Sequence, residues 1–336
     1  MKHLPNNNAK IALLYAIGLA LLVCAAMLGI LLGATQIDAE SLLSALFGKA
    51  PGSTTASILW LVRMPRVLAS LLCGAALAAS GAVIQTVLRN ALASPSIIGV
   101  NAGAALAVTL CSALGILSGW QLSFFAFLGA FAAVMTVSLG AKKWGASRGT
   151  VILMGVALNS LLGACSDTIT VFVPEVSILR NAFRIGDFSS VTYPKLIPAA
   201  VVITSALFML RTLSNELDVL SLGEDAARSL GMRTGFTRTV VLLLCAALAG
   251  TAVSIAGLVP FVGLLVPHAL RRMQVRQMGH LLTLCALYGA GFVTLCDTLS
   301  RMLFAPYEVP VGILMSFLGA PFFLFLLFRT RGDRHV

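Results

Sequence analysis

Charged residues that interrupt apolar segments are the first places to look for chemistry in this chain. Asp167 and Asp297 both lie toward the outer halves of such segments. Ionisable groups at membrane depth are costly, and they usually mark functional sites. A proton-coupled transporter usually has a carboxylate near the middle of the bilayer, and neither aspartate lies there. We therefore expect the energy source for any transport to lie outside this polypeptide.

Three arginines, Arg63, Arg66 and Arg301, also fall near the outer ends of apolar segments. Long basic side chains at such positions can extend to the membrane interface, and Arg301 can pair with Asp297 one helical turn earlier. The same three side chains can instead form a docking surface for an acidic extracellular partner. The residue types alone leave these interpretations open.

Motifs of enzymes and metal sites are absent from the sequence. It contains no G-x-x-x-x-G-K-[ST] loop, no H-E-x-x-H and no G-x-S-x-G. His268 and His280 have no second ligand nearby, and the seven cysteines include no C-x-x-C pair. We expect no catalytic residue, no bound metal and no cofactor, so an intramembrane enzyme is disfavoured.

The longest polar interval, Ser214 to Arg238, is predicted to contain a short soluble helix. Ser221 and Glu224 have the spacing of a capping box, in which both side chains satisfy free N–H groups at a helix start. Gly231 is a natural C-terminal stop. This helix can be a simple connector, or it can be a lever that a motor protein moves.

The composition of the chain predicts the elements that position these residues. Of the 336 residues, 59% are hydrophobic and 10% are charged, whereas a soluble domain has about a quarter charged residues. A membrane-spanning helix needs roughly 20 apolar residues, and the chain has about ten such segments: Ile11–Leu32, Ile58–Leu88, Ile97–Leu117, Leu122–Leu139, Val151–Val171, Leu196–Leu213, Val240–Ala256, Phe261–Leu270, Leu281–Leu303 and Val311–Phe328. The eighth is short and flanked by prolines, so it needs protein around it.

The basic residues predict the orientation of these segments. Most of them fall in alternate gaps, which places both termini and the 214–238 interval in the cytoplasm. Because the net charge of +11 lies in these loops, we do not expect nucleic-acid binding. A stretch that begins at Arg66 is similar to one that begins at Arg238, and the two run in opposite directions, as in an inverted repeat.

We therefore predict an all-α polytopic membrane protein that forms a single transmembrane domain over residues 1–336. Its expected parts are a first helix (11–32), a first half (58–213), a cytoplasmic coupling loop (214–238) and a second half (239–328). The first apolar run is too long for the core of a signal peptide, so we interpret it as a retained helix.

Several short motifs occur in one order along the chain. They comprise Arg63, Pro65 and Arg66; Gln85 with Asn90, Pro95 and Gly99; Pro267 and His268; Asp297 with Arg301; and Pro310 with Gly312. From about Arg63 to the C-terminus the sequence resembles the FecCD-type family, the iron-chelate and cobalamin permeases of binding-protein-dependent ABC importers.

This resemblance implies partners and residue roles. The partners would be two cytoplasmic ATP-binding subunits, an extracytoplasmic substrate-binding protein and a second permease subunit, either identical or a sister chain. Arg63, Arg66 and Arg301 match positions where the family meets acidic residues of the binding protein. The ATPase would contact a coupling segment that includes Ser221, Gly223, Glu224, Ala227, Arg228, Leu230 and Gly231. The inner gate would lie near Gly145, Ala146 and Ser147.

The hypothesis from the sequence is thus a multi-pass permease of a bacterial inner membrane. It would carry an iron-siderophore or a related metal chelate, such as haem or cobalamin, and would perform no covalent chemistry. The alternative is an ion-coupled secondary transporter of a small solute, which the missing midplane carboxylate disfavours. The sequence does not show which chelate is carried, or whether the permease dimer is homomeric.

Overall fold

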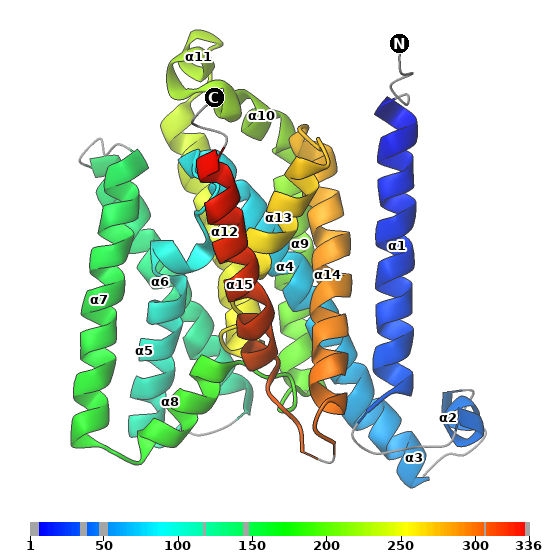
Figure 1. The fold of residues 1–336 in the computed structure, drawn as a ribbon. Coiled ribbons are helices and arrows are strands. Elements are labelled where there is room, and N and C mark those ends of the chain that lie inside the picture. Colours follow the sequence, from blue (N-terminus) through cyan, green and yellow to red (C-terminus); the bar gives the residue numbers. More distant parts are fainter. Residues whose placement is uncertain are drawn as a thin grey trace.

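The computed structural model describes residues 7–33, 39–46, 53–116, 119–143, 148–305 and 307–332, and these residues form helices and connections without a strand. Figure 1 shows the helices as a bundle with α4 at its centre. In chain order the elements are α1 (Asn7–Leu31), α2 (Ala39–Leu46), α3 (Thr54–Ser57), the π-helix η1 (Ile58–Arg63), α4 (Met64–Leu88), the 3-10 helix η2 (Pro95–Ile98), α5 (Val100–Ala113), α6 (Gly119–Lys143), α7 (Arg148–Phe172), α8 (Val176–Ile185), α9 (Tyr193–Thr212), α10 (Ser214–Leu222), α11 (Glu224–Ser229), α12 (Thr234–Ala256), α13 (Val262–Arg272), α14 (Met278–Met302) and α15 (Val311–Gly332).

The all-helical, polytopic character of the chain is confirmed. Seven helical stretches in the described residues are long and apolar enough to cross a membrane, namely α1, the continuous run from α3 to α4, α6, α7, α9, α12 and α14. The other predicted segments form the shorter helices α5 and α13, and α15, of which Val311–Leu324 is the shorter apolar stretch. A count of ten spans therefore stays a prediction.

The two ends of the bundle carry different short helices. Figure 1 shows the start of α1 and the end of α15 at the same end as α10 and α11, and it shows α2, α3 and α8 at the opposite end. The segments that begin at Arg66 and Arg238 lie on α4 and α12, which contact each other and run in opposite directions. This arrangement fits an inverted repeat, which itself stays a prediction.

Two short helices, α2 and α8, were not predicted from the sequence. Both are amphipathic and much shorter than a membrane span, with 8 and 10 residues. In α8, Ser177, Arg180, Asn181 and Arg184 alternate with apolar residues. A search for long apolar runs misses such helices because they need to cover only one apolar face.

The buried helix α4 packs against its neighbours through small residues. A methyl group on Gly74 would lie 2.2 Å from the carbonyl oxygen of Gly289 on α14, and one on Gly81 would lie 2.1 Å from that of Gly263 on α13. Helices in a bilayer gain little from hydrophobic burial against one another, so close backbone approach supplies much of the attraction. Small side chains on α4 therefore determine how near α13 and α14 can lie.

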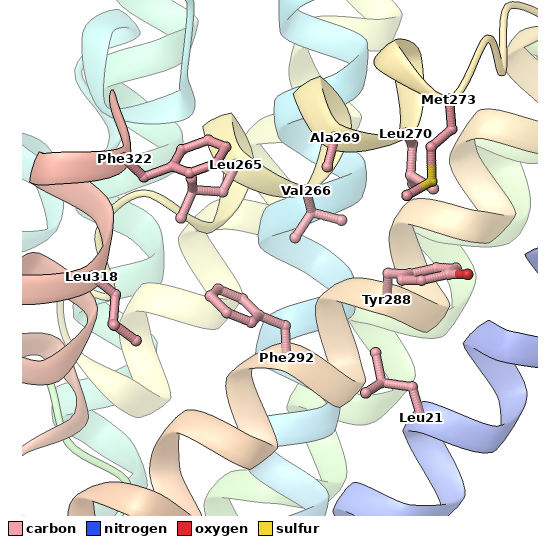
Figure 2. Close-up of a pocket in the computed structure, with 10 residues that line it drawn as sticks. All are labelled: Leu21, Leu265, Val266, Ala269, Leu270, Met273, Tyr288, Phe292, Leu318 and Phe322. Carbon is pink, nitrogen blue, oxygen red and sulfur yellow. The ribbon is translucent and has the colours of Figure 1, made fainter. Parts of the chain in front are cut away.

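A groove of about 410 Å³ lies beside α13 and is lined by apolar side chains of α1, α13, α14 and α15. Figure 2 shows Leu21, Val266, Phe292 and Leu318 facing it from these four helices, with Tyr288 at one side. We call it the α13 groove.

The close contact between α4 and α14 predicts that Gly74→Ala lowers stability. The added methyl group has no space beside Gly289, and overpacking of this kind costs about 1–3 kcal/mol. Thermal unfolding of the purified chain in detergent should show a lower midpoint for this variant. Gly235→Ala is the matched control, because nothing lies within 4 Å of that position. Equal midpoints for Gly74→Ala and the unmodified chain would contradict the packing argument.

Candidate functional site

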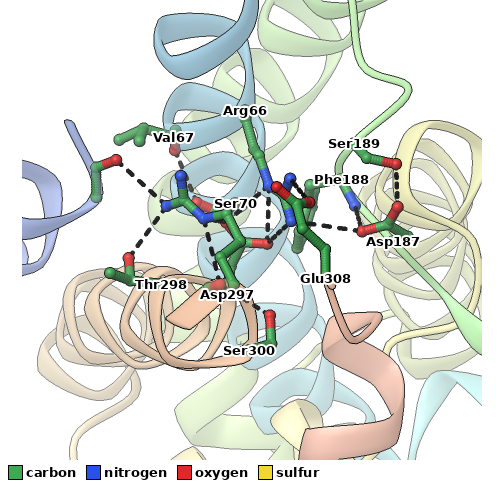
Figure 3. Close-up of polar contacts among 12 residues, drawn as sticks. Arg66, Val67, Ser70, Asp187, Phe188, Ser189, Asp297, Thr298, Ser300 and Glu308 are labelled. Atoms are coloured by element: carbon green, nitrogen blue, oxygen red, sulfur yellow. Dashed lines mark hydrogen bonds and ion pairs between the residues drawn. The ribbon is translucent and has the colours of Figure 1, made fainter. Parts of the chain in front are cut away.

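Arg66 lies in the first turn of α4, and its guanidinium group is surrounded by carboxylates (Figure 3). Its Nε donates to both carboxylate oxygens of Asp297 at 3.1 Å, and its Nη2 lies 3.0 Å from Oδ1 of the same residue. Its Nη1 donates to Glu308 Oε2 at 2.6 Å, and Asp187 Oδ1 lies 3.6 Å from Nη2. Arg66 is 3% exposed and Asp297 is 0% exposed. Charges this deeply buried must be paired.

Two further arginines join this group at the end of α1. Arg63 Nη1 donates to the carbonyl oxygens of Ile30 and Leu31, which are free because α1 ends there. Arg301 Nε lies 3.3 Å from Asp297 Oδ2, and its Nη2 donates to the carbonyl oxygen of Gly29. We call Arg63, Arg66, Arg301, Asp187, Asp297 and Glu308 the arginine cluster. Its three formal positive charges match its three negative charges.

The structure changes the interpretation of the three arginines. The pairing of Arg301 with Asp297 is confirmed. Extension of the side chains to the membrane interface is not what the structure shows, because all three are at most 3% exposed. The predicted direct display of Arg63, Arg66 and Arg301 to a partner also does not match this conformation. A role in docking stays a prediction that requires these side chains to be released first.

Two acidic members of the cluster had no role assigned from the sequence. Asp187 follows Gly186 in the connection between α8 and α9, and it accepts hydrogen bonds from Ser189 Oγ and from the backbone N–H of Phe188. Glu308 lies in the connection between α14 and α15. Arg66 and Asp297 are separated by 231 positions in the chain. No local pattern in one sequence could have indicated that these four residues meet.

The connections at this end of the bundle are joined by backbone hydrogen bonds. Asp187 N–H donates to the carbonyl oxygen of Ala256 at 2.8 Å, and Gly312 N–H donates to that of Gly186 at 3.2 Å. A methyl group on Gly312 would lie 1.7 Å from the carbonyl oxygen of Ile185, so only glycine fits there. The α8–α9, α12–α13 and α14–α15 connections are thereby fixed to one another beside the arginine cluster.

A cleft of about 640 Å³ opens between α5, α8, α15 and the α12–α13 connection. Its polar side chains are Asn101, Arg184 and Ser316, and much of the remaining surface is apolar, including Leu258 and Phe317. We call it the α8–α15 cleft. A cleft with this lining can hold a bulky, mostly apolar solute that carries a few acceptor groups.

The motif residues Gln85, Asn90, Pro95 and Gly99 stabilise the turn from α4 to α5. Gln85 Nε2 donates to the carbonyl oxygen of Gly263 at 3.0 Å, and Asn90 Oδ1 accepts from Leu92 N–H at 2.9 Å. Pro95 begins η2, and Gly99 has a φ of +99°, which suits glycine. All four residues thus stabilise the backbone of this turn.

The motif residues Pro267 and His268 lie within α13. Pro310 immediately precedes α15, and Gly312 is the second residue of α15. The His268 side chain is partly buried and makes no hydrogen bond to any residue that the structure describes. No group of three or more metal-ligating side chains occurs among the described residues. Asp167, the other intramembrane carboxylate, is 68% exposed and pairs with Arg180 of α8 at 2.5 Å.

The coupling segment differs from its predicted form. Ser221 lies in the last turn of α10 and donates to the carbonyl oxygen of Asp218, so the predicted capping box is wrong. Gly223, with a φ of +130°, separates α10 from α11 and occupies the N-cap position of α11. Glycine permits a sharp break that the Ser-x-x-Glu pattern does not reveal. Gly231, with a φ of +80°, ends the segment as predicted.

The segment is held together by charge pairs and presents apolar side chains outward. Glu224 pairs with Arg228 at 2.9 Å and with Arg238 of α12 at 3.4 Å. Ala227 is fully buried, whereas Leu230 is strongly exposed.

Leu222 and Phe236 are exposed as well. In addition, Asp218 Oδ1 accepts a hydrogen bond from Met278 N–H at the start of α14. The segment is thus attached to α12 and α14 and leaves apolar side chains free for a partner. Gly145, Ala146 and Ser147, the predicted inner gate, lie outside the described residues.

Comparisons with known proteins agree with this architecture. Residues 21–329 match the FecCD transport family. The iron-uptake system permease protein FeuB of Bacillus subtilis is 35% identical over 327 residues, which is 96% of this chain and 95% of FeuB. The hemin transport system permease protein HmuU of Yersinia pestis is 35% identical over 82% of this chain and 85% of HmuU. A solved inward-facing structure of the metal-chelate type of ABC transporter has a TM-score of 0.84 at 30% identity, covering 95% of this chain and 99% of that one.

The arginine cluster predicts that Asp297→Asn is strongly destabilising. Asp297 is the only carboxylate that pairs with Arg301 among the described residues, and it also holds Arg66. Removal of one partner from a buried ion pair costs about 3–5 kcal/mol. Unfolding in detergent should therefore occur at a clearly lower temperature. Asp167→Asn removes the same charge from an exposed pair and should change stability by only about 0–1 kcal/mol. A similar small effect at both positions would mean that the cluster contributes little to stability.

Proposed function

Since this chain belongs to the FecCD transport family, we propose that it is the membrane-spanning permease subunit of an ABC importer for a metal chelate. The observation that carries the proposal is the similarity to FeuB over nearly the whole of both chains. In this assignment the polypeptide itself hydrolyses nothing. It alternates between conformations whose populations are biased by partners.

The proposed substrate is a ferric siderophore or a related chelate such as haem or cobalamin. Relatives are named for iron uptake and for hemin transport. The α8–α15 cleft supports this class, because it combines apolar walls with Arg184, Asn101 and Ser316. An apolar cleft with a few polar groups suits a bulky chelate whose carboxylate or hydroxamate oxygens need donors.

The proposed assembly contains a second permease subunit, two ATP-binding subunits and an extracytoplasmic binding protein. In it, the chain would form one transmembrane domain of two related halves with about ten spans. Both termini would face the cytoplasm of a bacterial cell. The even number of spans is supported by the position of α1 and α15, which start and end at the same end of the bundle.

The proposed contact with the ATPase is the coupling segment. The short helix α11 is joined to α12 by the ion pair between Glu224 and Arg238. It is flanked in the chain by the exposed apolar side chains Leu222, Leu230 and Phe236. A motor that moves α11 would therefore also move α12. The contact of Asp218 with the start of α14 extends the same displacement to a second long helix.

The arginine cluster has a different proposed role at the opposite end. Acidic groups of a binding protein would compete with Asp297 and Glu308 for Arg66, with Asp297 for Arg301, and with the carbonyl oxygens at the end of α1 for Arg63. Exchange of partners would loosen the α8–α9 and α14–α15 connections, which are continuous with α8 and α15, two of the helices that line the α8–α15 cleft. Docking would then open the cleft instead of only holding the binding protein in place.

The alternative, an ion-coupled secondary transporter, needs a carboxylate that is free to bind an ion or a proton. Asp297 is fully buried, but it is paired with both Arg66 and Arg301. Asp167 is exposed and paired with Arg180. Neither arrangement favours reversible protonation during transport.

The proposed function predicts that a P-loop ATPase co-purifies with the chain from native membranes in mild detergent, as identified by mass spectrometry. Replacement of both Glu224 and Arg228 by glutamine should lower the yield of ATPase about fivefold, as expected for about 1 kcal/mol of lost interaction. Asp225→Asn, on the same helix and without an ion pair among the described residues, should leave the yield unchanged. If no ATPase appears under conditions that preserve a known importer, the proposal is wrong and the secondary transporter becomes the hypothesis to test.

The α8–α15 cleft predicts that water reaches the face of α15 that lines it but not the buried core of the bundle. In a background in which Cys24 and Cys165 are replaced by alanine, Ser316→Cys should react with a hydrophilic maleimide in permeabilised membranes. Ser300→Cys, at a fully buried position of α14, should stay unlabelled. Labelling at both positions, or at neither, would show that the α8–α15 cleft is not a specific aqueous path.

A further inference from the structure

A positively charged pocket of about 260 Å³ lies at the end of α4 that is next to the coupling segment. Arg89 and Arg271 line it together with Gln85, Asn90 and Ser221, and none of its lining residues is acidic. We call it the head pocket. Two guanidinium groups without a lining carboxylate make it a site for an anion.

Several hydrogen-bond donors of these two arginines have no acceptor among the described residues. Arg271 Nη2 donates to Thr86 Oγ1 at 2.7 Å and to the carbonyl oxygen of Ala82, but its buried Nε has no partner there. Arg89 is exposed and makes no side-chain hydrogen bond or ion pair with the described residues. A buried donor without an acceptor is costly, so an acceptor from outside the chain would be favourable.

The head pocket adjoins an apolar surface along α13 through shared lining residues. A small hollow lined by Leu264, Leu265, His268 and Phe322 also includes Ala91, which lines the head pocket as well. Leu265 and Phe322 in turn line the α13 groove shown in Figure 2. The head pocket and the α13 groove are therefore neighbours on either side of this small hollow, which has a volume of only about 10 Å³.

The dimensions of this surface match one leaflet of a membrane. α13 has 11 residues, which is about 16 Å of helix, or about half of the roughly 30 Å hydrocarbon core. Arg271 is next to its last residue, and Arg89 follows the end of α4 at the same end of the bundle. Basic pockets between helices at the cytoplasmic side of a membrane bind anionic lipid headgroups.

We propose that this chain binds one anionic phospholipid, with its phosphate between Arg89 and Arg271 and an acyl chain along α13 in the α13 groove. The charge of the head pocket selects against a zwitterionic lipid. The apolar extension distinguishes a lipid from a free phosphate ion. Arg89 Nη1 also lies close to Gly223, at 3.4 Å from the position of an added methyl group. The headgroup therefore lies beside the break between α10 and α11.

Native mass spectrometry of the full chain tests this proposal, with phosphatidylglycerol as the probe lipid. The unmodified chain should retain one phosphatidylglycerol after detergent exchange. Arg89→Gln should weaken retention about fivefold, and the variant with both Arg89→Gln and Arg271→Gln should weaken it about thirtyfold, if each basic residue contributes as at other membrane surfaces. Arg272→Gln removes an equal charge from an exposed position outside the pocket and should retain the lipid. Because Arg89 is exposed, its variant remains informative even if the double variant fails to fold.

A second variant tests the apolar half of the site. Ala269→Phe fills the α13 groove without removing a charge, and it should also reduce retention. Displacement of the lipid by inorganic phosphate together with unchanged retention in Ala269→Phe would reduce the site to a simple anion pocket and overturn the proposal. Equal retention in Arg89→Gln and Arg272→Gln would overturn it as well.

A third outcome concerns a protein occupant of the groove. If Ala269→Phe changes the mass of the oligomer but leaves lipid retention unchanged, a second copy of the chain covers the groove and the lipid assignment is wrong. These measurements require neither the ATPase nor a chelate. Their failure would therefore leave the proposed transport function unaffected.

Discussion

The buried charge of Arg66 is the constraint on which one end of this molecule depends. A guanidinium group at this depth is tolerated only if carboxylates reach it with good geometry. Those carboxylates come from α14 and from the α8–α9 and α14–α15 connections, so three parts of the chain must be in place around α4. Arg63 and Arg301 extend the same requirement to the end of α1. A single neutral cluster thus fixes the positions of α1, α4, α14 and the two connections relative to one another.

The long helix α4 connects this cluster with the opposite end of the bundle. Arg66 lies near its start and Arg89 follows its last residue, so its 25 residues place the two side chains about 35 Å apart. Between them, Gly74 and Gly81 bring α14 and α13 into backbone contact. Cores packed this closely do not deform gradually, and they move between discrete arrangements. The geometry therefore suits a permease in which events at one face are transmitted to the other by rigid helices.

Long apolar runs were the part of the structure that the sequence predicted best. Each predicted segment became a helix, because a backbone in hydrocarbon must satisfy its hydrogen bonds internally. The pairing of Arg301 with Asp297 and the stop at Gly231 were also predictable, since both depend on residues close in sequence.

The errors had two sources, namely contacts between distant parts of the chain and local features that a search for motifs and long apolar runs does not weigh. The burial of Arg63 and Arg66 depends on partners far along the chain. The supposed capping box at Ser221 failed because Gly223 broke the helix inside the motif. Both α2 and α8 escaped a search for long segments because they are short and amphipathic.

The arginine cluster also has a consequence for biosynthesis. Arg66 leaves the ribosome 231 residues before Asp297, so α4 must enter the membrane while its main counterion has not yet been made. An arginine in a membrane segment costs about 2.5–3.5 kcal/mol during insertion at the centre of the bilayer, and less near its surface. The helix continues for 22 residues beyond Arg66 to Leu88, which is about 33 Å, close to the thickness of the hydrocarbon core, so Arg66 can stay near that surface until α14 arrives. The order of synthesis thus restricts such a cluster to the edge of the bilayer. The surroundings of Arg66 on α4 are complete only when α14 and the connection to α15 have been made.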